Sequence, residues 1–211
     1  MKVNSMGTPL IPQEIFLLER YSSADYFGKL RDTWAEMITH LDRCLDEFLR
    51  QLPLDYRNRP LPEQPDAVWG ERVIPNFRDT LQALNEGYIR LLAGDLSSLK
   101  YCHGPLSDFK GQTDFWSGWM TRDDENTYGA LLNKAVTMAS NIRATEGAYW
   151  NPMRLSSRYD ESSRGPLDAP ANWPAYKLAS NISVVSGTKL PMSGIYLPDI
   201  DDSCAEFLFA E

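Results

Sequence analysis

The sequence feature that most constrains the fold is a long run of helical apolar spacing between residues 24 and 52. Its apolar side chains recur at steps of three and four residues, which is typical of an α-helix with one buried face. They are Phe27, Leu30, Trp34, Met37, Ile38, Leu41, Leu45, Phe48, Leu49 and Leu52. Ser22 or Ser23 can cap the start of this helix, and Pro53 can stop it. We therefore expect one long helix over residues 24–52.

Four more segments are expected to be helical, at about residues 12–21, 71–93, 106–120 and 125–149. Pro75 lies in the first turn of the second of these, where a missing N–H is tolerated, and Gly94 suits its end. Residues 53–70 contain four prolines, so we expect them to form a loop. Long helices joined by loops favour antiparallel neighbours, which predicts a bundle.

The composition changes after Trp150, because residues 151–178 are rich in Pro, Ser and Gly. We expect that stretch to be largely irregular and pinned by Trp173 and Tyr176. Three short strands are expected beyond it, over residues 182–187, 193–198 and 204–210. The predicted fold class is therefore mainly α: a helical bundle of four to five helices with a small antiparallel β element at the C-terminus.

A chain of 211 residues is long enough for one sizeable domain. We expect that domain to span residues 1–211, with its helical part at about 12–150 and the irregular segment and strands at about 151–211. The six Trp, ten Tyr and eight Phe supply large apolar surfaces for a core, and they leave room for a homodimer.

The net charge of −8 limits the classes of molecule that the protein is expected to bind. It argues against nucleic acid and anionic membranes, which both need a basic surface, and it allows a partner with a basic surface. Acidity of this size also simply keeps a protein soluble. We expect no secretory signal, because the first residues of the sequence include no long apolar region. The sequence has no apolar stretch near the roughly 20 residues that span a bilayer, and its three cysteines are scattered. We therefore expect a cytoplasmic protein.

Two pairs of side chains raise the question of metal or thiol chemistry. His40 and Cys44 are four residues apart on the expected long helix, while Cys102 and His103 are adjacent in a later segment. Four such ligands could in principle bind zinc. Adjacent Cys and His form an awkward ligand pair, however, and the sequence has no motif of a catalytic cysteine. We expect these residues to serve packing, and we predict no metal, no cofactor and no catalytic residue.

The acidic stretch "PDIDDS" near the C-terminus allows three interpretations. Asp199, Asp201 and Asp202 could form a solvated turn, a catalytic or metal-binding carboxylate cluster, or a surface for a basic partner. Tyr196 lies just before them and would supply an apolar anchor for a partner.

A second acidic edge is expected in "TRDDEN", where Asp123, Asp124 and Glu125 precede a helix. Carboxylates at this position are favoured by the helix dipole in any case. The aromatic stretch "FWSGWM" just before it fits core packing better than a ligand platform.

Five stretches together carry a family resemblance: "VWGERVIPNFRDTLQALNEGYIRLLAGDLS", "DFKGQTDFWSGWM", "SNIRATEGAYW", "RGPLDAPANWP" and "SGIYLPDIDDSCAEFL". Over about residues 12–209, the chain resembles the bacterial immunity proteins of polymorphic toxin systems, of the immunity 71 and 72 type. The resemblance implies a protein that binds and neutralises a cognate antibacterial toxin delivered by a type VI or contact-dependent route. It implies neither a cofactor nor catalysis.

The residues expected to contact a toxin are Asp199, Asp201, Asp202, Tyr196, Asp123, Asp124 and Glu125. Two other functions stay open at this point. One is a chaperone or adaptor that delivers an effector for a secretion system, and the other is a carboxylate- or metal-dependent hydrolase.

Overall fold

A computed structural model describes residues 11–112, 115–147, 149–150, 153–177, 179, 181–192, 194–197 and 207–210. Its α-helices are α1 (Pro12–Tyr21), α2 (Ala24–Leu49), α3 (Ile74–Leu92), α4 (His103–Gln112), α5 (Arg122–Arg143) and α6 (Glu161–Arg164). Shorter helical turns are η1 (Tyr56–Asn58), η2 (Leu61–Glu63), the π-helix η3 (Asp66–Val73) and η4 (Leu96–Cys102). The strands are β1 (Tyr149–Trp150), β2 (Gly194–Tyr196) and β3 (Phe207–Ala210).

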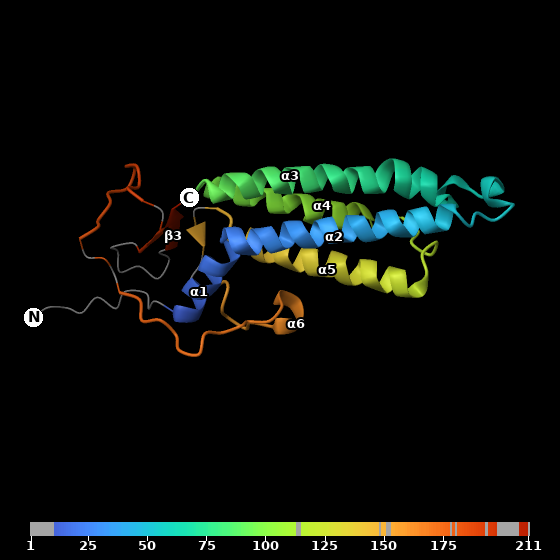
Figure 1. The fold of residues 1–211 in the computed structure, drawn as a ribbon. Coiled ribbons are helices and arrows are strands. Elements are labelled where there is room, and N and C mark those ends of the chain that lie inside the picture. Colours follow the sequence, from blue (N-terminus) through green and yellow to red (C-terminus); the bar gives the residue numbers. More distant parts are fainter. Residues whose placement is uncertain are drawn as a thin grey trace, which may run out of the picture.

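Four helices form an antiparallel bundle (Figure 1). Helix α2 packs against α3 and α5, and α4 closes the bundle by packing against the same two helices. The short helix α1 lies at one end, where it contacts α2 and α5. The predicted class, mainly α with a helical bundle, is therefore confirmed.

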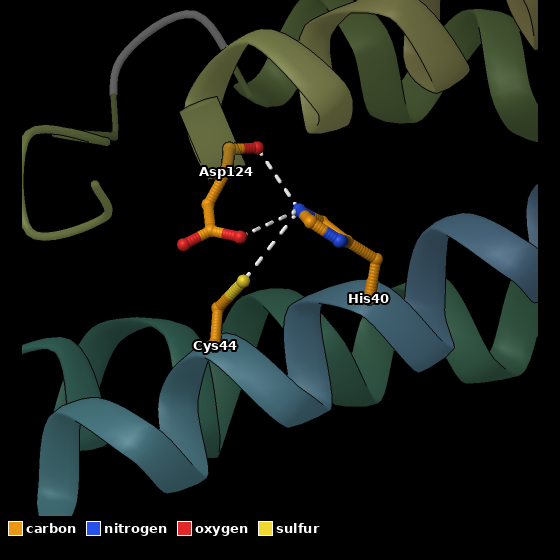
Figure 2. Close-up of side chains that lie close together, drawn as sticks. All are labelled: His40, Cys44 and Asp124. Carbon is orange, nitrogen blue, oxygen red and sulfur yellow. Dashed lines mark hydrogen bonds and ion pairs between the residues drawn. The ribbon is translucent and has the colours of Figure 1, made fainter. Parts of the chain in front are cut away.

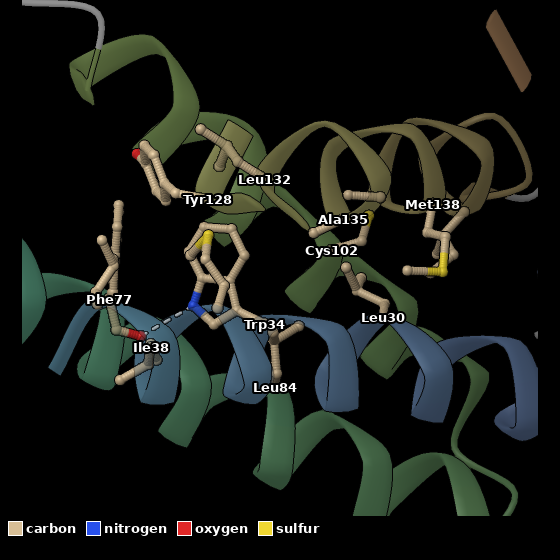
Figure 3. Packing of buried hydrophobic residues seen from close by; sticks show 14 of the residues in the cluster. Leu30, Trp34, Ile38, Phe77, Leu84, Cys102, Tyr128, Leu132, Ala135 and Met138 are labelled. Carbon is tan, nitrogen blue, oxygen red and sulfur yellow. Dashed lines mark hydrogen bonds between the residues drawn. The ribbon is translucent and has the colours of Figure 1, made fainter. Parts of the chain in front are cut away.

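Helix α2 supplies the centre of the core. Ser23 caps its start by accepting a hydrogen bond from the backbone N–H of Tyr26 at 3.1 Å. Trp34 is fully buried near side chains of α3, α5 and η4, and its indole N–H donates to the backbone carbonyl of Phe77 at 3.0 Å (Figure 3). The expected apolar face is thus the buried one, although the helix ends at Leu49, three residues earlier than expected.

The helix expected over residues 106–120 is wrong in its second half. Helix α4 begins at His103, directly after η4, and ends at Gln112, while residues 115–120 form bends and turns. A partner distant in sequence explains the difference, because the indole N–H of Trp69 donates to the carbonyl of Trp116 at 2.9 Å. In a helix that carbonyl would bond to its own chain four residues on.

Trp119 packs against the end of α2 and against η3. Its ring contacts those of Trp69 and Phe48 edge to face, with centroids 5.5 and 5.8 Å apart. Trp119 is buried, as expected for core packing, whereas Phe115 and Trp116 remain 37% and 42% exposed. In the stretch "FWSGWM", one aromatic ring is therefore part of the core and the other two are exposed at the surface.

The loop expected over residues 53–70 is wrong at its end. The π-helix η3 begins at Asp66 and runs directly into α3, so helical structure starts five residues before the expected position. Pro75, at the start of α3, has no N–H to donate to a carbonyl one turn earlier. The wider π turns lie immediately before this proline, where regular α-helical bonding is interrupted.

The expected ends of the last long helix also need correction. Helix α5 begins at Arg122 rather than 125 and ends at Arg143, and Gly147 then takes a left-handed conformation with φ of 96°. Tyr149 and Trp150, expected at the helix end, form β1 instead. A helix cannot continue through such a glycine turn.

The β element is a small antiparallel sheet with the order β1-β3-β2. Its strands β2 and β3 lie within two of the expected segments and pair as expected for a hairpin. The strand expected over residues 182–187 is wrong, since these residues are irregular and end in a turn. Val185 is 74% exposed, and among the described residues no strand pairs with this stretch.

The irregular segment after the sheet's first strand is fastened to α1. The buried carboxylate of Glu14 accepts from the backbone N–H groups of Leu155, at 2.9 Å, and Ser156, at 2.7 Å. Arg20 donates to the carbonyl of Leu167 at 2.7 Å. Trp173, expected to pin this segment, packs edge to face against Phe16 on α1, with ring centroids 5.6 Å apart.

Candidate functional site

Three side chains of ligand chemistry meet where α2 passes the start of α5 (Figure 2). His40 and Cys44 project from successive turns of α2, and Asp124 lies in the first turn of α5. The His40 ring nitrogen Nε2 lies 3.5 Å from the Cys44 sulfur and 2.9 Å from the backbone carbonyl of Asp124. The donor atoms of the three residues all lie within 4.8 Å of one another.

The guanidinium of Arg43 already supplies this cluster with a cation. Its Nη2 donates to the carboxylate of Asp124 at 2.5 Å and lies 3.3 Å from His40 Nδ1 and 3.6 Å from the Cys44 sulfur. Because guanidinium only donates, Nδ1 of His40 must accept and Nε2 must carry the proton that the Asp124 carbonyl receives. The cluster is thus a satisfied hydrogen-bond network that ties α2 to α5.

Two pKa shifts agree with a structural role for this network. Burial, reinforced by the charge of Asp124, raises the pKa of the Cys44 thiol to about 11, so the thiol stays protonated near neutral pH. The hydrogen bond from Thr121 and then the one from Arg43 lower the pKa of Asp124 below its ordinary value. A protonated thiol is a poor nucleophile, which does not favour cysteine catalysis here.

The three acids expected to contact a toxin from "TRDDEN" have different surroundings. Asp124 is turned inward, since Thr121 donates to its carboxylate at 2.6 Å and accepts from its N–H as the helix cap. Glu125 is half-buried and accepts from Ser117 at 2.5 Å. Of these three acids, only Asp123 is exposed, so its carboxylate is the most accessible to a partner.

The C-terminal candidates lie partly outside the described residues. Asp199, Asp201 and Asp202 belong to that undescribed part. Tyr196 lies in β2, half-buried, and its hydroxyl donates to the carbonyl of Met192 at 2.9 Å. The sheet that brackets the acidic stretch is present, and the placement of the stretch itself stays a prediction.

Exposed apolar side chains gather at the same end of the bundle as Asp123. We call this surface the loop end and define it as residues 52–63, 107–111, 115–116 and 122–125. Its large exposed apolar side chains are Leu52, Leu54, Leu61, Phe115 and Trp116. Sequence periodicity could not find these apolar side chains, because all five lie outside the α-helices.

A pocket of about 350 Å³ opens between α3 and α4, and residues of the loop end line part of it. Phe77 and Phe115 form part of its apolar wall, and Arg72 and Asp108 line it with charge. The half-buried carboxylate of Asp108 accepts from Asn76 at 2.7 Å and from Thr80 at 2.6 Å. Burial raises the pKa of Asp108, and no nearby cation among the described residues contributes to lowering it.

Cys102 and His103 form a second cluster of ligand chemistry with Glu146, a residue that sequence reasoning missed. The second cluster lies beyond the last turn of α5, whereas Asp124 lies in its first turn. The 22 residues of α5 separate the two by about 30 Å. The four His and Cys side chains therefore do not share one site, and each pair instead meets a carboxylate from the α5 region.

No protein-family model, no curated protein sequence and no solved structure matches this chain. The resemblance to immunity proteins therefore stays a prediction. In the described part of the chain, none of the helices has the length and apolar character needed to cross a membrane.

We expect the Asp124→Asn variant to be less stable at neutral pH by about 1 kcal/mol, because a charged hydrogen bond is lost. The folded-state pKa of Asp124 is lowered, so its contribution is present at neutral pH and is lost as the pH falls through that value. The difference from the parent chain should thus shrink below about pH 4. Urea unfolding at pH 7 and pH 3 measures it, with exposed Asp123→Asn as control. A difference unchanged at pH 3 would contradict the ionic origin.

Proposed function

We propose that this protein is an immunity protein that binds and neutralises a cognate antibacterial toxin in the cytoplasm of the cell that makes it. The toxin would reach that cell by a type VI or contact-dependent route and would present a basic surface. The net charge of −8 supports the proposal, because opposite charge speeds the encounter of such partners.

The observation that carries the proposal is the composition of the loop end. Tight protein interfaces combine a few buried aromatic or aliphatic anchors with a polar rim. At the loop end, the exposed rings of Phe115 and Trp116 lie close in sequence to the acidic first turn of α5. Of the three negative charges of that turn, that of Asp124 is paired with Arg43, which leaves those of Asp123 and Glu125 beside the positive charge of Arg122.

The pocket that the loop end partly lines could bind a basic side chain of the toxin. A Lys or Arg could lay its methylene groups on Phe77 and Phe115 and pair its charge with Asp108. Pairing with a cation would also offset the free-energy cost of burying the charged carboxylate of Asp108, the cost that raises its pKa.

The test of function uses the polypeptide encoded beside the gene for this chain. Cells that express this polypeptide alone should stop growing, and cells that also express the immunity protein should survive. Survival without loss of the polypeptide's toxicity in a purified assay would instead favour a chaperone or adaptor. Equal growth with and without the protein would overturn the proposal.

The interface is tested with Asp123→Lys and Trp116→Ala. We expect Asp123→Lys to slow association by about 10-fold at low salt, and Trp116→Ala to weaken affinity by about 30-fold. Surface plasmon resonance measures both rates. Asp25→Lys is the matched control, since Asp25 occupies the same position in the first turn of α2. Wild-type kinetics for both test variants would exclude the loop end as the interface.

A further inference from the structure

Cys102, His103 and Glu146 bring three kinds of metal ligand to one place. Cys102 is the last residue of η4, His103 is the first residue of α4, and Glu146 follows the end of α5. A thiol sulfur, an imidazole nitrogen and a carboxylate oxygen lie within 4.8 Å of one another. The His103 Nε2 and the Glu146 carboxylate are already hydrogen-bonded to each other.

The spacing suits one ion of the zinc class. Zinc binds sulfur at about 2.3 Å and nitrogen or oxygen at about 2.0–2.2 Å, which places tetrahedral ligands about 3.3–3.8 Å apart. Donors within 4.8 Å of one another reach that separation by small side-chain rotations. Mixed sulfur, nitrogen and oxygen ligands also select such an ion over magnesium or calcium, which prefer oxygen alone.

One side of the Cys102, His103 and Glu146 cluster faces the solvent, and the other side faces the core. Cys102 is fully buried, whereas the side chains of His103 and Glu146 are 52% and 27% exposed. An ion can therefore enter from the solvent side and keep a water molecule as its fourth ligand.

The first cluster shows what this one lacks. At His40, Cys44 and Asp124, the guanidinium of Arg43 occupies the position of the cation and bonds to the carboxylate. At the second cluster, within the described part of the chain, no Arg or Lys forms an ion pair with Glu146. The charge of Arg143 acts on Cys102, but the described residues place no guanidinium on the carboxylate of Glu146 as Arg43 is placed on that of Asp124.

We propose that Cys102, His103 and Glu146 bind one Zn²⁺ ion or a similar divalent transition metal, with water as the fourth ligand. Binding replaces the thiol proton of Cys102, which passes to the solvent, and it replaces the hydrogen bond between His103 and Glu146. The ion would join the start of α4 to the end of α5. This proposal does not depend on the proposed toxin-binding function.

The test titrates the purified chain with Zn²⁺ by calorimetry and with Co²⁺ as a spectroscopic probe. We expect one ion per chain, and Co²⁺ should give the near-ultraviolet band of a thiolate-to-metal charge transfer. The exposed ligand variant His103→Gln should weaken Zn²⁺ binding by at least about 100-fold. Cys102→Ser should abolish the charge-transfer band.

Matched variants at the first cluster provide the control. His40→Gln and Cys44→Ser should leave both the stoichiometry and the band unchanged. Circular dichroism of each variant shows that loss of binding is not loss of fold. The proposal is overturned if no ion binds, if binding survives both His103→Gln and Cys102→Ser, or if the band disappears with Cys44→Ser instead.

Discussion

The Trp34→Ala variant should lose about 3–5 kcal/mol of stability, the usual cost of removing a large aromatic side chain from a core. Trp34 is fully buried at the centre of the bundle, and its ring lies edge to face on Phe77 with centroids 5.1 Å apart. The lost side chain leaves a cavity between α2, α3 and α5, and the neighbouring side chains can fill it only in part. A domain is typically stable by about 5–15 kcal/mol, so this loss is a large fraction of the total.

Chemical denaturation of Trp34→Ala and Trp34→Phe separates the two contributions of this side chain. The phenylalanine variant keeps most of the apolar volume and loses the hydrogen bond to the Phe77 carbonyl, so we expect a loss of about 1–2 kcal/mol. Trp116→Ala is the control, because that ring is 42% exposed, and its loss should stay near or below about 1 kcal/mol. Equal losses for Trp34→Ala and Trp116→Ala would refute the central role of Trp34.

The Glu14→Ala variant should cost about 2–4 kcal/mol, because it leaves the buried backbone N–H of Leu155 and the half-buried one of Ser156 without their acceptor. The segment they belong to contains two residues in the left-handed region, Met153 with φ of 67° and Arg158 with φ of 53°. Non-glycine residues hold this conformation only when surrounding contacts fix it. The carboxylate of Glu14 is such a contact, so its removal should loosen the segment as well as lower stability.

Limited trypsin digestion together with urea unfolding checks this prediction. Arg154 and Arg158 flank the residues that Glu14 holds, and we expect cleavage there to become markedly faster in Glu14→Ala. Glu14→Gln should fall between, because its amide oxygen still accepts but its NH₂ group meets backbone donors. Glu19→Ala is the control, since Glu19 is exposed on the same helix. Cleavage that is unchanged in Glu14→Ala would show that other contacts hold the segment.

Local sequence was sufficient where a helix is defined by its own apolar face. The spacing from Phe27 to Leu45 predicted the buried side of α2, and the expected cap, Ser22 or Ser23, is Ser23. It failed at "FWSGWM", where the aromatic spacing fits a helix equally well. In the structure this stretch forms bends and turns, and the Trp116 carbonyl accepts a hydrogen bond from the distant Trp69. Such a contact carries no signal in the stretch itself.

The candidate site was predictable only in its parts. His40 and Cys44 share a helix face by their spacing, and "TRDDEN" was placed at a helix start. That Asp124 turns inward to Arg43 depends on how α2 and α5 are rotated in the bundle, which the sequence does not state. Glu14 gave no signal at all, because its partners lie more than 140 residues away.

The order of strands in the sheet has a consequence for how the chain assembles during synthesis. β3 is the middle strand, and it follows both of its partners in the sequence. The bundle is complete in sequence by Arg143, so it can form while the ribosome is still adding residues. Among the described strands, β1 pairs with β3 alone, so its partner residues Phe207 and Leu208 emerge about 60 residues later. A ribosome that stalls in this interval would hold a folded bundle with an open strand edge, which is the state most exposed to aggregation and proteolysis.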